Sequence, residues 1–217
     1  MNLALGGSST GIINTAAGNI SISGVISGTG ALVKEGNRTL TFNGGKSYTG
    51  GTTINNGTLS VSAGALPTNI TINSGGTLVL ANHNMLTAGG NMTINSGTLN
   101  LSVYAQGSGP STANFNDATI TGGGGFLRGV STYNFTGNTT WSNSAMDLLT
   151  APTLNVISGT TTIASSFNIG NGNANITKNG NGTLVLSAAN SYTSATILNA
   201  GTLAINNATA IGSGTLT

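Results

Sequence analysis

Few side chains in this sequence could carry out chemistry. The acids are Glu35, Asp117 and Asp147, the single histidine is His83, and cysteine is absent. Glycoside hydrolysis needs two paired carboxylates. Asp117 and Asp147 are about 30 positions apart, so they form such a pair only if the fold brings them together, and two solvated loop acids are the simpler interpretation. A single histidine and no cysteine do not supply the ligands of a zinc site, and without cysteine the chain has no thiol nucleophile. We therefore expect no enzyme, no bound metal and no cofactor.

The charge content excludes further classes of protein. Of 217 residues, five are basic and three are acidic, so 4% of the chain is charged and the net charge is +2, against about 25% charged residues in ordinary soluble domains. Nucleic-acid binding depends on neutralising several phosphates, which so few basic residues cannot do. No apolar run reaches the roughly 18 residues that span a bilayer, and residues 1–20 lack the features of a secretion signal. We expect neither nucleic-acid binding nor membrane insertion by this segment.

Two local motifs have ordinary interpretations. His83 lies between two expected strands and is predicted to be a turn residue. The Gly122–Gly125 run is followed by no expected helix, so it is neither a phosphate-binding loop nor a dinucleotide-binding motif. It predicts a flexible bulge or a tight corner.

One short phrase recurs along the chain. An apolar residue in a Thr/Asn setting is followed by a polar turn that ends in Gly, and then by Thr-Leu, as in TINNGTLSV, TINSGGTLVL and TINSGTLNL. The Gly before Thr-Leu falls at positions 57, 76, 97, 182, 201 and 214, and neighbouring phrases are mostly about 19 to 23 residues apart. This spacing is typical of one coil of a solenoid.

Each phrase also alternates with a period of two. Leu59 and Val61 share one face of the segment and Ser60 and Ser62 the other, which is the pattern of a half-buried strand. The tripeptides that end in Gly tolerate the left-handed backbone angles of a tight corner. The sequence therefore predicts an all-β fold, a parallel β-helix of roughly ten coils and about 50 Å in length, with almost no α-helix. A compact β-sandwich, the alternative, gives no reason for the constant spacing.

A longer correspondence lies over the short one. The block around Lys34-Glu-Gly36-Asn-Arg-Thr39-Leu40 matches the block around Lys178-Asn-Gly180-Asn-Gly-Thr183-Leu184 at a constant offset of 178 − 34 = 144. The residues that define the repeat are Lys34, Gly36, Tyr48, Gly57 and Leu59 in the first block, and Lys178, Gly180, Tyr192, Gly201 and Leu203 in the second.

Both blocks resemble the passenger-associated transport repeat, or autotransporter-associated β-strand repeat, of bacterial surface proteins. The resemblance implies a right-handed β-helix within a large passenger that is exported across the outer membrane and is often adhesive, so an extracellular or cell-surface location is expected. Arg38 and Ser194 stand where the repeat has glycine. We expect a single solenoid over residues 1–217, with the closest repeats at 18–103 and 174–216 and irregular coils with insertion loops at 104–159.

Two pairs of repeat residues invite a functional interpretation. Lys34 and Lys178 occupy equivalent places where charge is otherwise rare. A ligand contact is one interpretation, and a solvated charge that guards a strand edge against wrong pairing is the favoured one. Tyr48 and Tyr192 also correspond, and we expect them to pack a loop against the coil rather than to stack on a sugar.

The irregular middle of the chain holds most of the aromatic residues. Function in solenoids often lies on insertions, so one hypothesis is that these residues form a ligand surface; burial of the aromatics inside degenerate coils is the favoured interpretation. The predicted surface consists of Tyr104, Phe115, Arg128, Tyr133 and Trp141.

Three functions follow as hypotheses. The first is a non-enzymatic structural or adhesive segment of a surface passenger, with a host-surface or matrix glycan or protein as partner. The second is a self-assembling extracellular fibre whose uncapped coils stack end to end through Leu3, Leu5 and Leu216, so that the partner is another copy. The third is an ice-binding face made of outward threonines, although the phrases do not give Thr-x-Thr on every coil.

Overall fold

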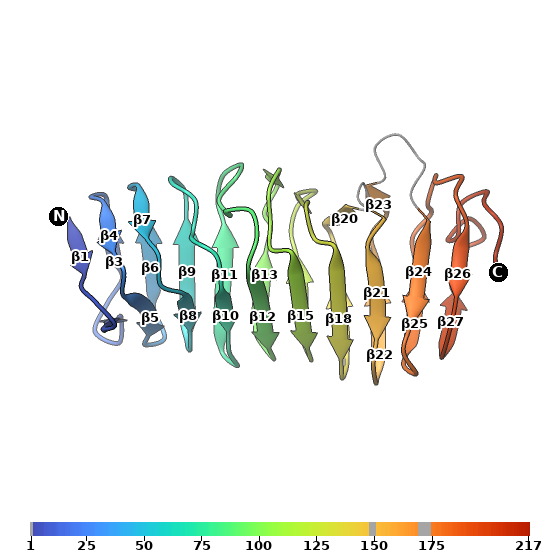
Figure 1. The fold of residues 1–217 in the computed structure, drawn as a ribbon, viewed down its shortest axis with the longest axis horizontal. Helices are drawn as coiled ribbons and strands as arrows, with labels where there is room; N and C mark the ends of the chain where they lie inside the picture. Colours follow the sequence, from blue (N-terminus) through green and yellow to red (C-terminus); the bar gives the residue numbers. More distant parts are fainter. Residues whose placement is uncertain (1, 148–150, 169–174) are drawn as a thin grey trace.

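The chain forms one elongated stack of coils. The computed structural model describes residues 2–147, 151–168 and 175–217, and within these ranges it contains strands and turns but no α-helix. The two ends of the chain lie at opposite ends of the stack (Figure 1). All the strand pairs are parallel, and two sheets of ten strands run the length of the molecule. The prediction of an all-β parallel solenoid of roughly ten coils is confirmed.

Each coil contributes one strand to each of the two long sheets. The first long sheet contains β2 (Thr10–Asn14), β5 (Ala31–Glu35), β8 (Thr52–Ile54), β10 (Ile70–Ile72), β12 (Asn91–Asn95), β15 (Thr112–Asn116), β18 (Thr132–Thr136), β21 (Thr153–Val156), β24 (Ile176–Asn179) and β26 (Thr196–Leu198). The second long sheet contains β3 (Ile20–Ile22), β6 (Thr39–Phe42), β9 (Gly57–Val61), β11 (Gly76–Leu80), β13 (Thr98–Asn100), β16 (Thr119–Thr121), β19 (Thr139–Trp141), β22 (Thr160–Ile163), β25 (Thr183–Leu186) and β27 (Thr202–Ile205).

The third side of the solenoid is made of two shorter sheets. One contains β1 (Leu3–Leu5), β4 (Ile26–Gly28) and β7 (Lys46–Tyr48), and the other contains β14 (Ala105–Gln106), β17 (Phe126–Leu127), β20 (Ala145–Asp147) and β23 (Phe167–Asn168). Between these two sheets, an isolated parallel bridge joins Leu66 to Leu86. The third side is therefore where the coils vary most.

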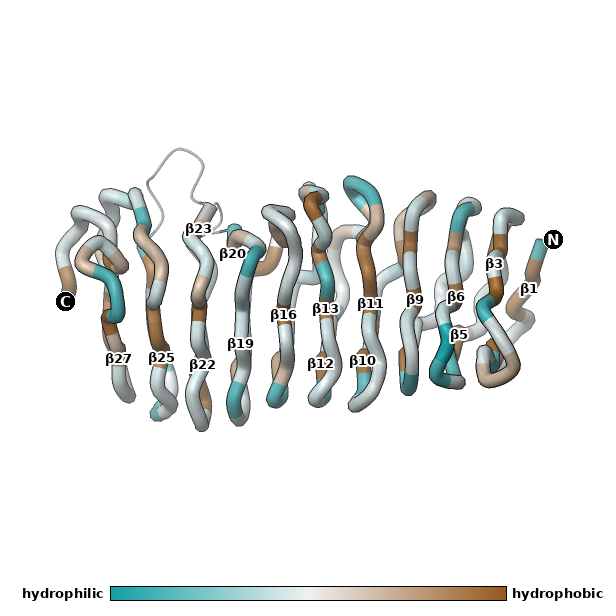
Figure 2. The backbone as a smooth tube through the Cα atoms, turned by 180° about the vertical axis from the view of Figure 1, so that it is seen from behind, coloured by the Kyte–Doolittle hydropathy of each residue, from teal (hydrophilic) through white to brown (hydrophobic). Residues whose placement is uncertain are grey.

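The register places like residues on like residues. In the second long sheet Thr58 pairs with Thr77 and Leu59 pairs with Leu78, so the leucines point inward and are fully buried while the threonines point outward. Hydrophobic stretches accordingly recur on neighbouring strands (Figure 2). Stacking of identical residues at strand spacing favours neutral side chains on the outer surface, which explains the low charge content.

Outward positions on the second long sheet form an unbroken column of threonines. Successive strand pairs bring these residues into register, and all seven are at least partly exposed. The threonine column consists of Thr39, Thr58, Thr77, Thr98, Thr119, Thr140 and Thr162.

Outward positions on the first long sheet carry two asparagine ladders. In each ladder the side-chain amide of one coil donates a hydrogen bond to the side-chain oxygen of the coil before it, at 2.5–3.2 Å. The first ladder is Asn55, Asn73, Asn95 and Asn116 and ends on the carboxylate of Glu35. The second ladder is Asn114, Asn134, Asn155, Asn179 and Asn199. Strand β15 belongs to both ladders, so amide bonding continues across most of the sheet.

Aromatic residues fill the core of the irregular coils. Phe115, Tyr133, Phe135 and Trp141 are fully buried, and their ring centroids lie 5.4–6.3 Å apart. They stand at inward positions, in register with aliphatic residues such as Ile94. The favoured interpretation, burial inside the irregular coils, is confirmed for Phe115, Tyr133 and Trp141, and the ligand-surface hypothesis is wrong for them, because these aromatic residues replace aliphatic ones inside the coil.

Candidate ligand-binding groove

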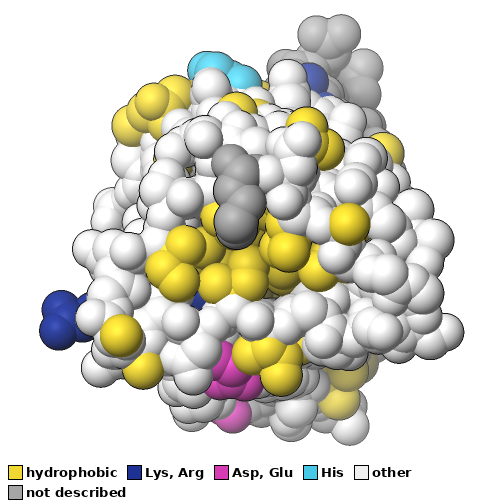
Figure 3. Space-filling model, turned by 90° about the vertical axis from the view of Figure 1, so that its left-hand side faces the viewer, with side chains coloured by type: hydrophobic (Ala, Val, Ile, Leu, Met, Phe, Trp, Pro, Cys, Tyr) yellow, Lys and Arg dark blue, Asp and Glu magenta, His cyan; other side chains and the backbone are white. Residues whose placement is uncertain are grey.

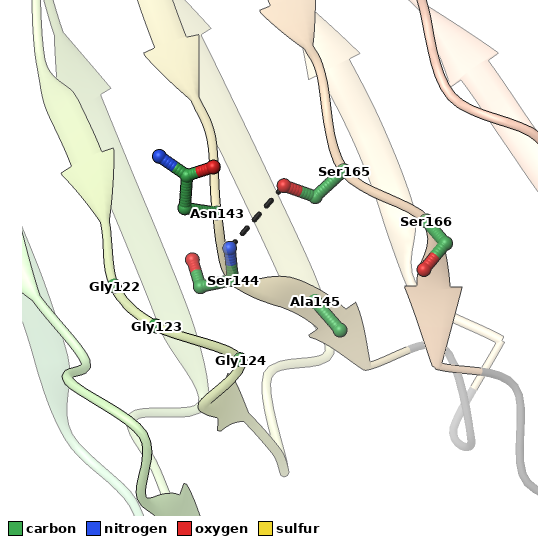
Figure 4. Close-up of a pocket in the computed structure, with 8 residues that line it drawn as sticks. All are labelled: Gly122, Gly123, Gly124, Asn143, Ser144, Ala145, Ser165 and Ser166. Carbon is green, nitrogen blue, oxygen red and sulfur yellow. Dashed lines mark hydrogen bonds between the residues drawn. The ribbon is translucent and has the colours of Figure 1, made fainter.

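A groove runs across the corners that lead from the second long sheet to the third side. Three successive coils line it (Figure 4), and its volume is about 530 Å³. We name it the corner groove. Its lining is Gly122, Gly123, Gly124, Asn143, Ser144, Ala145, Ser165 and Ser166.

Local backbone geometry shapes the corner groove. Gly124 has φ +115° and Asn143 has φ +56°, both in the left-handed region, where Gly and Asn are favoured. A Cβ atom on Gly124 would meet no heavy atom within 4 Å, so the groove is open above it. The Gly124 amide donates to the Asn143 carbonyl oxygen at 2.8 Å. The Ser144 amide donates to Ser165 Oγ at 3.2 Å, the bond drawn as a dashed line in Figure 4. The walls are therefore tied together before any ligand binds.

The corner groove offers hydrogen-bonding groups without charge. The side chains of Asn143 and Ser166 are exposed, and within the described residues neither takes part in a hydrogen bond. The lining contains no acidic or basic residue. Such a surface suits a ligand that carries neutral donors and acceptors.

An aromatic side chain lies next to the groove. Phe126 on β17 is half-buried and pairs in register with Ala145 of the groove. The guanidinium carbon of Arg128 lies 5.0 Å from the centroid of the Phe126 ring. Arg128 Nε also donates to Asp147 Oδ2 at 2.7 Å, and Asp147 is buried. The ion pair neutralises the nearest charge, and the expectation that Asp147 is a solvated loop acid is wrong.

A second exposed cluster lies one coil away. Tyr104 is half-buried and its ring meets that of exposed His83 edge-on, with centroids 5.1 Å apart. His83 Nδ1 accepts a hydrogen bond from the Ala105 amide at 3.1 Å, so the histidine fixes a turn. Val103 is 61% exposed and lies beside Gly123. Of the five residues predicted as a ligand surface, Tyr104 and Arg128 are the two that reach the outside.

The two repeat lysines lie inside the solenoid. Lys34 is fully buried, and its ammonium donates to the carbonyl oxygens of Glu35, Gly36 and Asn56 at 2.9, 2.7 and 2.9 Å. Lys178 is also fully buried and donates in the same way to the carbonyl oxygens of Asn179, Gly180 and Ala200 at 3.0, 2.7 and 2.9 Å. We call this arrangement of three carbonyl oxygens around an ammonium the lysine cage. In each cage the third carbonyl belongs to the next coil. Both predicted roles, solvated edge guard and ligand contact, are wrong, because each lysine instead ties two coils together at the corner between the long sheets.

Burial changes the proton affinity of the caged lysines. Desolvation lowers the pKa of Lys34, against a smaller opposing effect of the Glu35 carboxylate, and it also lowers the pKa of Lys178. Lys46 donates to the carbonyls of Gly44, Ala63 and Gly64 in a similar way but is partly exposed, and desolvation lowers its pKa to about 8.

The two repeat tyrosines also point inward. Tyr48 and Tyr192 are buried, and their hydroxyls share hydrogen bonds with the hydroxyls of Thr52 and Thr196 at 2.5 and 2.6 Å. Desolvation raises the pKa of both phenols. They pack the third side against the first long sheet and present no ring to a ligand.

The repeat glycines stand where the backbone demands them. Gly36, Gly57, Gly180 and Gly201 all have φ between +66° and +77°. A Cβ atom on Gly180 would lie 2.3 Å from the carbonyl oxygen of Val156. These residues therefore define the corner between the long sheets rather than a binding site.

The acidic residues do not gather. Asp117 lies at the corner between the long sheets, where its Oδ1 accepts from the Asn138 amide at 2.8 Å, whereas Asp147 lies on the third side. The Glu35 carboxylate accepts a hydrogen bond from Asn55, the N-terminal member of the first asparagine ladder. Within the described ranges, no three His, Cys, Asp or Glu residues form a group that could hold a metal ion.

Sequence reasoning missed the corner groove because its residues are small and neutral. Gly123, Ser144 and Ser165 follow one another at intervals of 21 residues, close to the coil spacing. Counting forward from the Gly122–Gly125 corner in steps of one coil length would have identified Ser144 and Ser165 as its neighbours in the stack. Nothing in their residue types alone pointed to a site.

Comparison with known proteins gives one match. The searches of curated proteins and of solved structures found no similar protein. The family model described as passenger-associated-transport-repeat matches residues 32–61, 71–101 and 176–205. The corner groove lies between the second and third matched segments. Three segments of this β-solenoid are therefore similar to the passenger-associated-transport repeat.

Proposed function

We propose that this chain is a non-enzymatic segment of a bacterial surface passenger, which holds an adhesive surface away from the cell. The observation that carries the proposal is the stack itself: three segments similar to the passenger-associated-transport repeat lie in two sheets that continue through ten strands without a break. Such a stack, about 50 Å long at strand spacing, suits a spacer.

The location and the shape can be tested together. Antibodies against the purified chain should label intact cells of the bacterium that makes it, or its culture fluid; labelling only after permeabilisation would contradict a surface role. Negative-stain microscopy of the purified chain should show separate rods about 50 Å long.

The corner groove is the surface we propose for adhesion. It is open, it lies at the corners that lead to the third side, and it stands outside the matched repeats. The two long sheets, by contrast, present stacked threonine and asparagine side chains, and the asparagine amides bond to one another. The third side is where the coils vary most, as expected of a rigid support that carries a site on one side.

Assembly into a fibre is a second candidate, favoured by the N-terminal end of the stack. Apolar side chains are visible in the middle of that end (Figure 3). Among the residues of the first coil, Leu3, Ile13 and Ile20 are only partly buried. At the other end Leu216 is 49% exposed and bridges to Thr196. Leu5 is buried, so its predicted place in an end-to-end contact is wrong. Filaments instead of separate rods in negative stain would favour this candidate.

Ice binding is a third candidate, favoured by the threonine column. The column is continuous over seven coils, but the outward position two residues along holds Thr41, Ser60, Val79 and Asn100, so a second column is missing. A solution of the purified chain that shows no thermal hysteresis would eliminate this function.

A further inference from the structure

We infer that the corner groove binds a neutral oligosaccharide made of pyranose units, and this inference rests on the proposed adhesive function. A sugar ring offers hydroxyl groups at its edge and an apolar C–H face, so a matching site needs neutral hydrogen-bonding groups beside an apolar surface. The groove supplies the hydroxyl of Ser166 and the amide of Asn143, both exposed. The outward methyl group of Ala145 and the Cα atoms of Gly122, Gly123 and Gly124 supply the apolar surface.

The size of the groove fits this class of ligand. Its volume of about 530 Å³ lies within the range of about 300–1,000 Å³ for small-molecule sites. Gly124 carries no side chain and faces open space, so a ligand can approach the backbone there. Hydrogen bonds across the walls, such as that from the Ser144 amide to Ser165, fix the groove before binding and reduce the entropy lost on association.

Charge argues against an anionic ligand. The lining contains no basic residue, and the nearest guanidinium, that of Arg128, is paired with buried Asp147 at 2.7 Å. A sulfated or acidic sugar would lose hydration without gaining a free cation. A cation would likewise find no free carboxylate in the lining.

Backbone pairing argues against an added peptide strand. A peptide that extends a sheet needs free amide and carbonyl groups along an edge. The Gly124 and Ser144 amides at the groove walls already donate to Asn143 and Ser165, and β20 is paired with strands on both sides. The groove therefore favours side-chain recognition of a small, neutral polyol.

The test is binding of the purified chain to a broad panel of neutral, sialylated and sulfated oligosaccharides, followed by calorimetry with the best neutral ligand. Ala145→Leu places bulk at an outward strand position in the groove and should weaken binding at least about tenfold, or 1.4 kcal/mol. Asn143→Gly keeps the left-handed angle but removes the amide, and should weaken binding about fivefold. Ala204→Leu, at a partly exposed position on β27 outside the groove, is the matched control and should change nothing.

Each result decides the inference. All three variants must keep the wild-type circular dichroism spectrum and urea midpoint. Binding to no neutral sugar, binding to charged sugars alone, or equal binding by wild type and Ala145→Leu would overturn it. If the chain still adheres to host-surface or matrix material while Ala145→Leu has no effect, the adhesive function stands and the groove is not its site. If the chain adheres to nothing, the proposed function itself fails.

Discussion

At the residue scale, the caged lysines are the most unusual feature of this molecule. A buried ammonium is costly unless its hydrogen bonds are satisfied. Lys34 and Lys178 meet this condition with three backbone carbonyls each, taken from two successive coils. The same carbonyls would have no partner of this kind if the lysine were replaced, so the cage stabilises the corner as well as the charge.

Replacing a caged lysine by methionine should therefore be strongly destabilising. In Lys34→Met or Lys178→Met the side-chain length is kept, but three carbonyl oxygens lose a charged donor. We expect the free energy of unfolding to fall by about 3 kcal/mol in each variant, measured by urea denaturation.

Lys46→Met is the matched control for both variants. Lys46 also donates to three carbonyls but is partly exposed, so water can replace the amine and the loss should stay below about 1 kcal/mol. An equal fall in the free energy of unfolding at all three positions would contradict a special stabilising role for the two buried lysines.

The dependence of stability on pH should be unusual. The pKa of Lys46 is about 8 in the fold and 10.5 in the unfolded chain. Between these values the unfolded chain binds more protons, so stability rises with pH. Above about pH 10 the sign reverses, because Tyr48 and Tyr192 keep protons in the fold that the unfolded chain has lost.

Urea midpoints measured from about pH 7 to 11 should therefore peak near pH 9–10. In Lys46→Met the rise between pH 8 and 10 should be smaller, while the fall above pH 10 remains. A maximum at neutral pH would contradict the lowered lysine pKa values.

At the element scale, replacing one donating amide nitrogen of an asparagine ladder by an oxygen should lower the stability of the fold. Asn95 donates to Asn73 and accepts from Asn116. In Asn95→Asp the carboxylate still accepts but cannot donate, and its oxygen faces that of Asn73. We expect a loss of about 1–2 kcal/mol in the free energy of unfolding at pH 7, and partial recovery near pH 3, where the protonated acid can donate again.

Asn100→Asp is the control for the ladder. The Asn100 side chain lies outward on β13 and only accepts a hydrogen bond, from the Ser102 amide at 2.8 Å, which aspartate can do equally well. A similar loss in both variants would mean that the charge, and not the broken ladder, is responsible.

The elements themselves were largely predictable from the sequence. Because leucine alternates with threonine around Leu59 and Leu78, the inward and outward faces of the strands could be predicted. The spacing of the Gly-Thr-Leu phrases predicted the length of one coil. The prediction for Lys34 failed because residue type was given more weight than position: Lys34 stands two residues after Leu32 and shares its inward phase. The same inward phase supports the favoured interpretation of the irregular coils, in which aromatics such as Tyr133 and Phe135 are buried.

The corner groove was harder to predict for a physical reason. Its members come from three corners, and corners lack the period of two that marks strands. Their juxtaposition depends on the exact length of each coil, which Gly and Ser at those positions do not reveal. The ion pair of Arg128 with Asp147 likewise joins neighbouring coils and follows from no local pattern.

At the scale of the whole molecule, stability should vary along the axis. Each coil contacts mainly its neighbours, so an end coil has fewer partners than a central one. The central coils also hold the aromatic cluster of Phe115, Tyr133 and Trp141, whereas Leu3 and Ile13 at one end are only partly buried.

Amide hydrogen exchange should follow this gradient. Peptides from β15 to β19 should exchange most slowly, and those from β1 to β3 should exchange fastest, when exchange is followed by mass spectrometry. Uniform exchange along the chain would show that the solenoid opens as one cooperative unit instead.

The uniform direction of the asparagine ladders gives the solenoid an electrical polarity. Neighbouring backbone groups in a sheet alternate in direction and largely cancel, but every ladder amide turns its N–H toward the N-terminal end and its oxygen toward the C-terminal end. Their dipoles therefore add along the axis, with the positive end toward Glu35, whose carboxylate receives the last N–H of the first ladder. A molecule that meets the solenoid end-on would thus meet two electrostatically different ends, although the net charge of the chain is only +2.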